Sequence, residues 1–202
     1  MIKLYHAQLT RSVRILWLLE ELGLPYELAT VPFTPPTPST AFSQRTPFGK
    51  FPTIEDGDLT MFESGAILEY ILERYGQGRL APAPGTPARG RFLQWVHFAE
   101  ASMFPPLGVI AVNTLFKPEA ERIPAAVDDA RATGAAAMRV LEGALDGKTY
   151  LLGAELSGAD IMMGYTLMTA KLLGVLTDQY PNVNAYFERL QTRPGFQKAL
   201  AA

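Results

Sequence analysis

The spacing of apolar residues differs between the first third of the chain and the remainder. Short alternating runs predict strands at Ile2–Tyr5, Tyr26–Val31, Thr53–Glu55 and Leu59–Phe62. A nearly all-apolar helix over Val13–Leu22 separates the first two strands, and Gly23 stands where a left-handed residue commonly ends a helix. Strands joined by a helix pair in parallel, whereas strands joined by a short turn pair antiparallel. The pattern therefore predicts a mixed sheet.

Prolines and a serine mark the elements around the second pair of strands. Prolines recur between Pro32 and Pro38, which excludes regular structure there and predicts an extended loop. Ser64 is predicted to cap a helix. The apolar face of that helix is formed by Ile67, Leu68, Ile71, Leu72 and Tyr75.

The second half of the chain carries helical periodicity only. Residues 77–90 are rich in Gly, Pro and Ala without periodicity, which predicts a linker between a domain of residues 1–76 and an all-α domain of residues 91–202. One helix start is well marked, because Ser157 and Asp160 have the spacing of a capping box. We interpret this box as structural.

Composition narrows the classes of function. The 202 residues are 48% apolar and 19% charged, which is typical of a globular protein. A net charge of −2 provides no positive field for a phosphate backbone, so nucleic acid is not an expected partner. The apolar stretch Phe104–Val112 is about half the roughly 20 residues of a membrane-spanning helix, and no secretory signal is visible. We expect no membrane association and a cytoplasmic location.

Cysteine and histidine usage limits the chemistry further. The absence of cysteine excludes disulfides, thiolate metal sites and a cysteine nucleophile. Two histidines, His6 and His97, are too few for a histidine-based zinc site without carboxylate partners, so no metal is expected. Any thiol chemistry therefore needs a sulfur that a ligand supplies.

Two motifs relate the chain to a known family. Residues 46–54 read Thr-Pro-Phe-Gly-Lys-Phe-Pro-Thr-Ile, and residues 63–67 read Glu-Ser-Gly-Ala-Ile. Through these two motifs the chain resembles the glutathione transferase superfamily. The pattern of that superfamily is Asn-Pro-x-Gly-x-x-Pro-x-Leu followed by Glu-Ser-x-Ala-Ile, and here Thr46 replaces the usual Asn. The resemblance covers the whole chain and implies an α/β thioredoxin-like domain of order β-α-β-α-β-β-α, followed by an all-helical domain.

The resemblance also implies how glutathione binds as co-substrate. Phe51–Pro52 is expected to be cis and to present the backbone of Phe51 to the extended tripeptide as a short added strand. Ser64, at a helix N-terminus, suits the γ-glutamyl carboxylate, and Glu63 suits the neighbouring ammonium. Lys50 is expected to attract the remaining carboxylate. The alternatives are a structural turn, an ordinary helix cap and a solvated lysine.

The group that activates the sulfur is open. The run Thr-Arg-Ser-Val-Arg at residues 10–14 resembles a Ser-Arg-Ser/Ala-x-Arg run of some bacterial and fungal members, which puts Thr10 at the hydroxyl position. The candidates in order are Thr10, then Ser12 and Arg11, and last Tyr5, whose side chain can face the sheet. Each has a structural alternative: helix caps for the hydroxyls, solvated charges for Arg11 and Arg14, and packing for Tyr5. His6 is close, although we expect it to be incidental.

The helical domain is expected to supply the surface for the second substrate. Pro105 and Pro106 are predicted to break its first long helix beside Met103, Phe104 and Leu107, which are candidates for an electrophile pocket or, alternatively, core residues. The leading hypothesis is a homodimeric transferase that conjugates glutathione to hydrophobic electrophiles in detoxification. The alternatives are a glutathione-dependent peroxidase or disulfide reductase, and a non-catalytic binding protein of the same fold.

Overall fold

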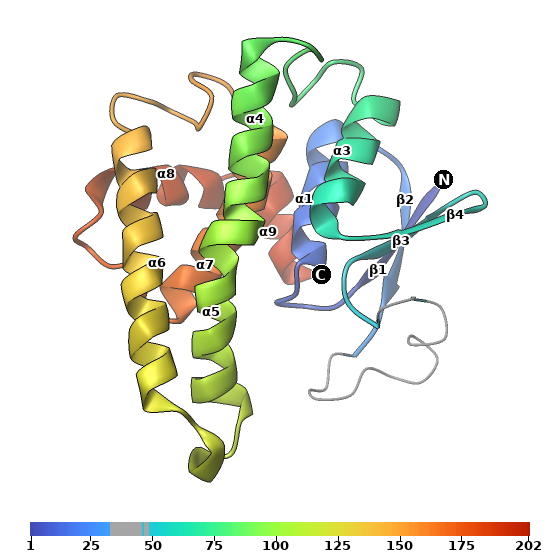
Figure 1. Cartoon of the computed structure of the whole chain (residues 1–202). Helices are drawn as coiled ribbons and strands as arrows, with labels where there is room; N and C mark the ends of the chain where they lie inside the picture. Colours follow the sequence, from blue (N-terminus) through green and yellow to red (C-terminus); the bar gives the residue numbers. More distant parts are fainter. Residues whose placement is uncertain (33–45, 47–48) are drawn as a thin grey trace. The chain divides into compact units, whose positions relative to one another are not determined.

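The chain divides into two compact units. The computed structural model describes residues 1–32, 46 and 49–202. The first unit comprises Met1–Ala81 and Gln191–Ala202, and the second comprises Pro82–Leu190 (Figure 1). This division differs from the predicted boundaries in two respects. The first helix of the second unit begins at Pro87, inside the predicted linker, and the last residues of the chain pack with the first unit.

A four-stranded sheet forms the frame of the first unit. Its strand order is β2-β1-β3-β4, and its strands are β1 (Ile2–His6), β2 (Tyr26–Thr30), β3 (Thr53–Asp56) and β4 (Leu59–Phe62). As predicted, β1 pairs with β2 in parallel and β3 pairs with β4 antiparallel. Tyr5 lies opposite Thr53, which lies opposite Phe62. The end of β1, the start of β3 and the end of β4 therefore lie at one end of the sheet.

Helix α1 (Ser12–Leu22) is the central helix of the first unit. It is buried except for two glutamates, and it packs against β1, α3 (Ser64–Tyr75) and α9 (Pro194–Ala201). In Figure 1, α1 and α3 cover the same face of the sheet. The helix ends at Gly23 with φ 63°, as its sequence predicts. A second helix in this domain, implied by the family resemblance, falls outside the described residues.

The second unit is helical, as predicted. Its α-helices are α4 (Pro87–His97), α5 (Phe104–Ala111), α6 (Pro124–Ala144), α7 (Gly158–Leu172) and α8 (Pro181–Gln191). Two π-helical stretches, Phe98–Met103 and Val112–Phe116, and a 3₁₀ turn at Glu119–Glu121 complete it. Helix α7, which is buried over its first ten residues, is contacted by α4 and α5. The predicted capping box of Ser157 and Asp160 is present at its start.

The prediction that two prolines break the first long helix is wrong. Pro105 and Pro106 occupy the first turn of α5, and the backbone stays helical from Pro87 to Phe116. A proline is tolerated in the first turn of a helix, and the π-helical stretch before α5 changes the hydrogen-bond pattern at that point. By length and composition this helical segment meets the criteria for a membrane span. Its buried residues pack against α6 and α7, as in the core helix of a globular domain.

Candidate functional site

Three segments meet at the end of the sheet where β1 and β4 stop. They are the loop between β1 and α1, the turn before β3 and the first residue of α3, and the strand register brings them together. The Phe51–Pro52 peptide is cis, as the resemblance implies. Phe51 is buried and packs in one cluster with Tyr5 and Ala7. The motif residues of the sequence therefore share one region of the first unit.

The candidate hydroxyls differ in accessibility. Ser12 is fully buried, whereas Thr10 is half-buried. The phenolic hydroxyl of Tyr5 donates a hydrogen bond to Glu55 at 2.8 Å, and the Tyr5 side chain is 5% exposed. Arg11, the residue before α1, is half-buried. Among these three hydroxyls, Thr10 alone combines a position at the start of α1 with accessible surface.

The hydroxyls of Thr10 and Ser12 belong to a buried polar cluster that includes His6. The two oxygens are 2.7 Å apart, and Ser12 Oγ is 2.9 Å from His6 Nδ1. His6 has no exposed surface, and burial lowers its pKa, although the backbone of Ala202 opposes that effect. The expectation that His6 is incidental missed this contact. A buried strand position is usually occupied by an apolar residue. A histidine at the end of such a strand therefore indicates a polar partner for its ring.

A second polar contact joins α1 to α3. The guanidinium of Arg14, which has no exposed surface, donates a hydrogen bond of 2.9 Å from Nη1 to Ser64 Oγ. Neither alternative interpretation of these residues is correct: Arg14 is not a solvated charge, and Ser64 is the first residue of α3 rather than its cap. In the sequence, the position of Arg14 within an otherwise apolar helical run indicates that its side chain is buried. The contact places positive charge at the start of α3.

Residues with a strained backbone directly precede Thr10 and Ser64. Leu9, which precedes Thr10, has φ 58°, and Glu63, which precedes Ser64, has φ 72°. Each such conformation costs roughly 1–3 kcal/mol for a residue other than glycine, and it persists only where the surroundings impose it. Strained residues of this kind concentrate at functional sites. In the described part of the chain, Gln77 and Leu80 also have positive φ, so the strain agrees with the candidate site but does not by itself identify it.

The remaining candidates differ in exposure. Lys50 and Glu63 are exposed. In the second unit, Met103 and Leu107 are each 1% exposed, whereas Phe104 is half-buried and stacks on Tyr165 with ring centroids 5.9 Å apart. Among the described residues, no group of three or more His, Asp or Glu side chains is arranged to hold a metal ion.

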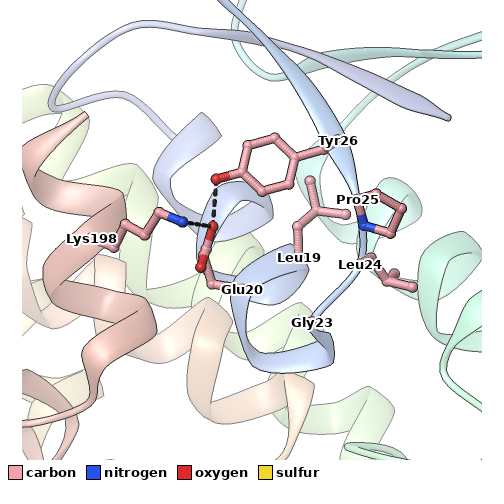
Figure 2. Close-up of a pocket in the computed structure, with 7 residues that line it drawn as sticks. All are labelled: Leu19, Glu20, Gly23, Leu24, Pro25, Tyr26 and Lys198. Atoms are coloured by element: carbon pink, nitrogen blue, oxygen red, sulfur yellow. Dashed lines mark hydrogen bonds and ion pairs between the residues drawn. The ribbon is translucent and has the colours of Figure 1, made fainter.

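A hollow lies at the opposite end of α1 from the candidate site. Leu19, Glu20, Tyr26 and Lys198 are among its lining residues (Figure 2). Glu20 accepts a hydrogen bond from the hydroxyl of Tyr26 and forms an ion pair with Lys198, with Oε1 and Nζ 2.7 Å apart. Burial raises the pKa of Glu20, but the hydrogen bonds from Lys198 and Tyr26 bring it below its usual value. Lys198 neutralises the charge of Glu20 and Tyr26 adds a hydrogen bond, so these contacts join α1, β2 and α9.

Comparisons with known proteins agree with the fold and the motifs. The N-terminal domain model of glutathione S-transferase matches residues 1–73, and the C-terminal domain model matches residues 124–189. The probable glutathione S-transferase GSTF1 of Oryza sativa subsp. japonica is 32% identical over 211 residues, covering 96% of this chain and 93% of the relative.

Two solved structures extend the comparison. A glutathione transferase homolog from Lodderomyces elongisporus with two GSH per subunit has a TM-score of 0.87 and 25% identity, covering 99% of this chain and 97% of that one. A glutathione transferase family member from Pseudomonas fluorescens Pf-5 with two glutathione bound has a TM-score of 0.84 and 28% identity, covering 98% and 92%. Because both domain models match and a relative aligns with nearly the whole chain, the chain belongs to the glutathione S-transferase family of enzymes.

Proposed function

We propose that this enzyme conjugates the thiolate of glutathione to hydrophobic electrophiles, with the Thr10 hydroxyl as hydrogen-bond donor to the sulfur. The observation that carries this proposal is the difference between the three hydroxyls. Ser12 is fully buried, Tyr5 is 5% exposed and bonded to Glu55, and Thr10 keeps accessible surface at the start of α1. The Thr10 hydroxyl donates to the backbone oxygen of Ala7 at 2.7 Å, and in the proposed complex this hydrogen turns to the sulfur. A sulfur beside Thr10 also lies near the positive end of the α1 dipole.

These two groups are sufficient to activate the thiol. Lowering a thiol pKa of about 8.5 by two units needs ~2.7 kcal/mol. A helix N-terminus contributes up to ~2 kcal/mol and a hydrogen bond to a charged group ~1.5–3 kcal/mol. The nucleophilicity of a thiolate falls as its pKa falls, so activation alone gives a small gain. Most of the acceleration then comes from holding the electrophile beside the sulfur.

The glutathione site that we propose uses both motifs. The N–H groups at the start of α3 bind the γ-glutamyl carboxylate together with the Ser64 hydroxyl. The Ser64 side chain is 2% exposed, and the buried guanidinium of Arg14 orients its hydroxyl and adds positive charge. Glu63, exposed beside Ser64, accepts the ammonium of the same moiety. The backbone at Phe51–Pro52 pairs with the peptide, and Lys50 attracts its remaining carboxylate.

The proposal also covers the residue that contacts the electrophile, the oligomeric state and the cellular location. Of Met103, Phe104 and Leu107, Phe104 retains surface for contact with a hydrophobic electrophile, because the other two are in the core of the second unit. Resemblance to the family supports a homodimer, a cytoplasmic location and a role in detoxification.

A second candidate function is glutathione-dependent reduction of hydroperoxides or disulfides. It is favoured by the two structural relatives described above, which hold two glutathione molecules. Such a reaction needs a second glutathione thiol where a transferase binds its electrophile. Turnover of hydroperoxides or mixed disulfides without turnover of aryl halides would favour this second function over the transferase function.

The decisive experiment combines binding with a titration of the thiol. Glutathione is titrated into the purified protein by calorimetry, and the ultraviolet absorbance of the bound thiolate is followed against pH. We expect binding with a thiol pKa well below that of free glutathione, and Ser64→Ala is expected to weaken binding about tenfold through loss of a hydrogen bond to a charged group. Absence of binding at millimolar glutathione would contradict the proposal.

A further inference from the structure

The turn between β1 and α1 has a leucine at a position that favours glycine. The N–H of Thr10 donates to the backbone oxygen of Ala7 at 3.3 Å, so residues 7–10 form a tight turn with Leu9 at its third position. The backbone φ of Leu9 is 58°, whereas that of Gln8 is not positive. Positive φ at the third position alone is typical of a type II turn, in which glycine is the usual residue there. A leucine is unfavourable at this position, because its Cβ crowds the backbone in the left-handed conformation.

The residues on both sides of Leu9 hold the turn in this conformation. Ala7 is 1% exposed and belongs to an apolar cluster of the first unit. Its N–H donates to the buried Oγ of Ser12 at 3.2 Å, and its backbone oxygen accepts a second hydrogen bond, from the Thr10 hydroxyl, at 2.7 Å. A strained conformation persists only where the surroundings impose it, and these contacts supply that constraint.

Burial does not account for the leucine in this turn. The Leu9 side chain is 66% exposed, whereas that of Leu80, the other leucine with positive φ in the described part of the chain, is half-buried. A single exposed leucine is ordinary on a protein surface, but a glycine here would avoid the strain. An exposed apolar side chain that is kept at the cost of strain points to a contact with a bound molecule, since strain of this kind concentrates at functional sites.

The place of Leu9 in the chain indicates which part of a bound molecule it contacts. Leu9 directly precedes Thr10, which donates to the glutathione sulfur in the proposed function, and consecutive Cα atoms are about 3.8 Å apart. Glutathione itself carries charged and peptide groups, which suit polar contacts. An apolar group bonded to the sulfur suits a leucine, because contact removes apolar surface of both from water. We propose that Leu9 is a specificity-determining residue whose side chain contacts the apolar group of the electrophile.

This inference rests on the proposed function, and it assigns Leu9 no part in the bond changes. With an aryl halide, the thiolate forms a carbon–sulfur bond, the carbon–halogen bond breaks, and the halide leaves with its electron pair. The thiol proton has already passed to solvent. Leu9 stabilises the bound electrophile and the conjugate through apolar contact, so its effect is expected to grow with the apolar area next to the sulfur.

The test compares two conjugates of glutathione that differ only in the group on the sulfur. Calorimetry on the full chain measures the affinities of S-methylglutathione and S-hexylglutathione, neither of which has a thiol to ionise. Leu9→Ala is expected to weaken binding of S-hexylglutathione about 3- to 10-fold, because it removes part of the apolar contact area, and to leave that of S-methylglutathione within about twofold. The matched control is Leu59→Ala, at an exposed leucine on β4 at the opposite end of the sheet, which is expected to change neither affinity.

A glycine variant tests the strain separately. Leu9→Gly removes the same apolar side chain but suits a positive φ, so its thermal unfolding midpoint is expected to exceed that of Leu9→Ala. Its loss of affinity for S-hexylglutathione is expected to be at least as large as that of Leu9→Ala. A midpoint of Leu9→Gly at or below that of Leu9→Ala would remove the strain argument and overturn the inference.

Two binding results would also overturn the inference while leaving the proposed function intact. One is an unchanged ratio of the two affinities in Leu9→Ala. The other is an equal loss for both conjugates, which would make Leu9 a support for glutathione itself. Failure of the unmodified protein to bind S-methylglutathione would instead overturn the proposed function.

Discussion

The starts of helices α1 and α7 contain two buried polar clusters that differ in their acceptors. At α7, both oxygens of the Asp160 carboxylate accept hydrogen bonds, from the N–H groups of Leu151 and Ser157 and from the hydroxyls of Ser157 and Tyr186, all at 2.7–2.9 Å. At α1, within the described part of the chain, Thr10, Ser12 and His6 have as partners two hydroxyls, an imidazole and the backbones of Ala7 and Ala202.

This difference separates a structural cluster from one suited to chemistry. Two of the four hydrogen bonds to Asp160 come from backbone N–H groups, which can only donate, and together with the two hydroxyl donors they give the cluster at α7 a single arrangement. Hydroxyls and a neutral imidazole each donate and accept, so the cluster at α1 has two arrangements and ends at a half-buried hydroxyl. The cluster at α7 therefore satisfies buried groups only, whereas the cluster at α1 ends at a hydroxyl that a bound molecule can reach.

Removing the carboxylate is expected to have the largest effect on stability. Asp160→Ala leaves several buried donors without an acceptor, each at a cost of ~1–3 kcal/mol, so the free energy of unfolding of the second unit falls by roughly 3 kcal/mol or more. Thermal and urea unfolding measure this loss. Tyr186→Phe, which removes one donor, is expected to cost about 1 kcal/mol. An unchanged stability of Asp160→Ala would refute the structural role.

Removing the terminal hydroxyl at α1 is expected to affect turnover rather than stability. Thr10→Val deletes a hydrogen bond to the thiolate, worth ~1.5–3 kcal/mol, so kcat/KM falls about 10- to 100-fold. Steady-state kinetics with an aryl halide measure the change, and the unfolding midpoint is expected to move little. Thr60→Val, at an exposed threonine of β4, is the matched control. A fully active Thr10→Val would assign activation to another group.

Loss of the guanidinium between α1 and α3 is expected to weaken glutathione binding. Arg14→Met retains the apolar stem but removes the donor to Ser64, so the affinity falls about tenfold, the equivalent of ~1.4 kcal/mol. Calorimetry with S-methylglutathione isolates this effect from thiol ionisation. The control is Arg79→Met, which removes a hydrogen bond of 2.8 Å to the backbone oxygen of Leu22, at the other end of α1. Equal losses in both variants would argue against a carboxylate site at Ser64.

The smallest expected effect is a pH dependence of stability. Burial lowers the pKa of His6, so below its ordinary value of about 6.5 the unfolded chain binds more protons than the folded chain. Stability therefore falls as pH decreases through this range, by less than about 1.4 kcal/mol per pH unit for one proton. Unfolding of His6→Asn at several pH values is expected to show a smaller slope. An identical slope in both proteins would contradict this assignment.

Local sequence signals predicted most of the frame and the motif positions. Alternation located the four strands to within a residue or two, and Gly23 and the Ser157–Asp160 box marked a helix end and a helix start. The antiparallel hairpin and the parallel pair followed from the lengths of their connections. Domain boundaries were less accurate, because α9 joins the first unit through contacts with α1 that no local pattern encodes.

The sequence by itself determined the elements, their pairing and the family motifs, because periodicity and turn chemistry are local properties of the chain. Only the tertiary structure decided what each polar side chain contacts. It paired Tyr5 with Glu55 and Arg14 with Ser64, in each case across 50 residues, and buried His6 against Ser12. The direction and burial of a side chain depend on segments distant in the sequence, so they are fixed only when those segments pack together.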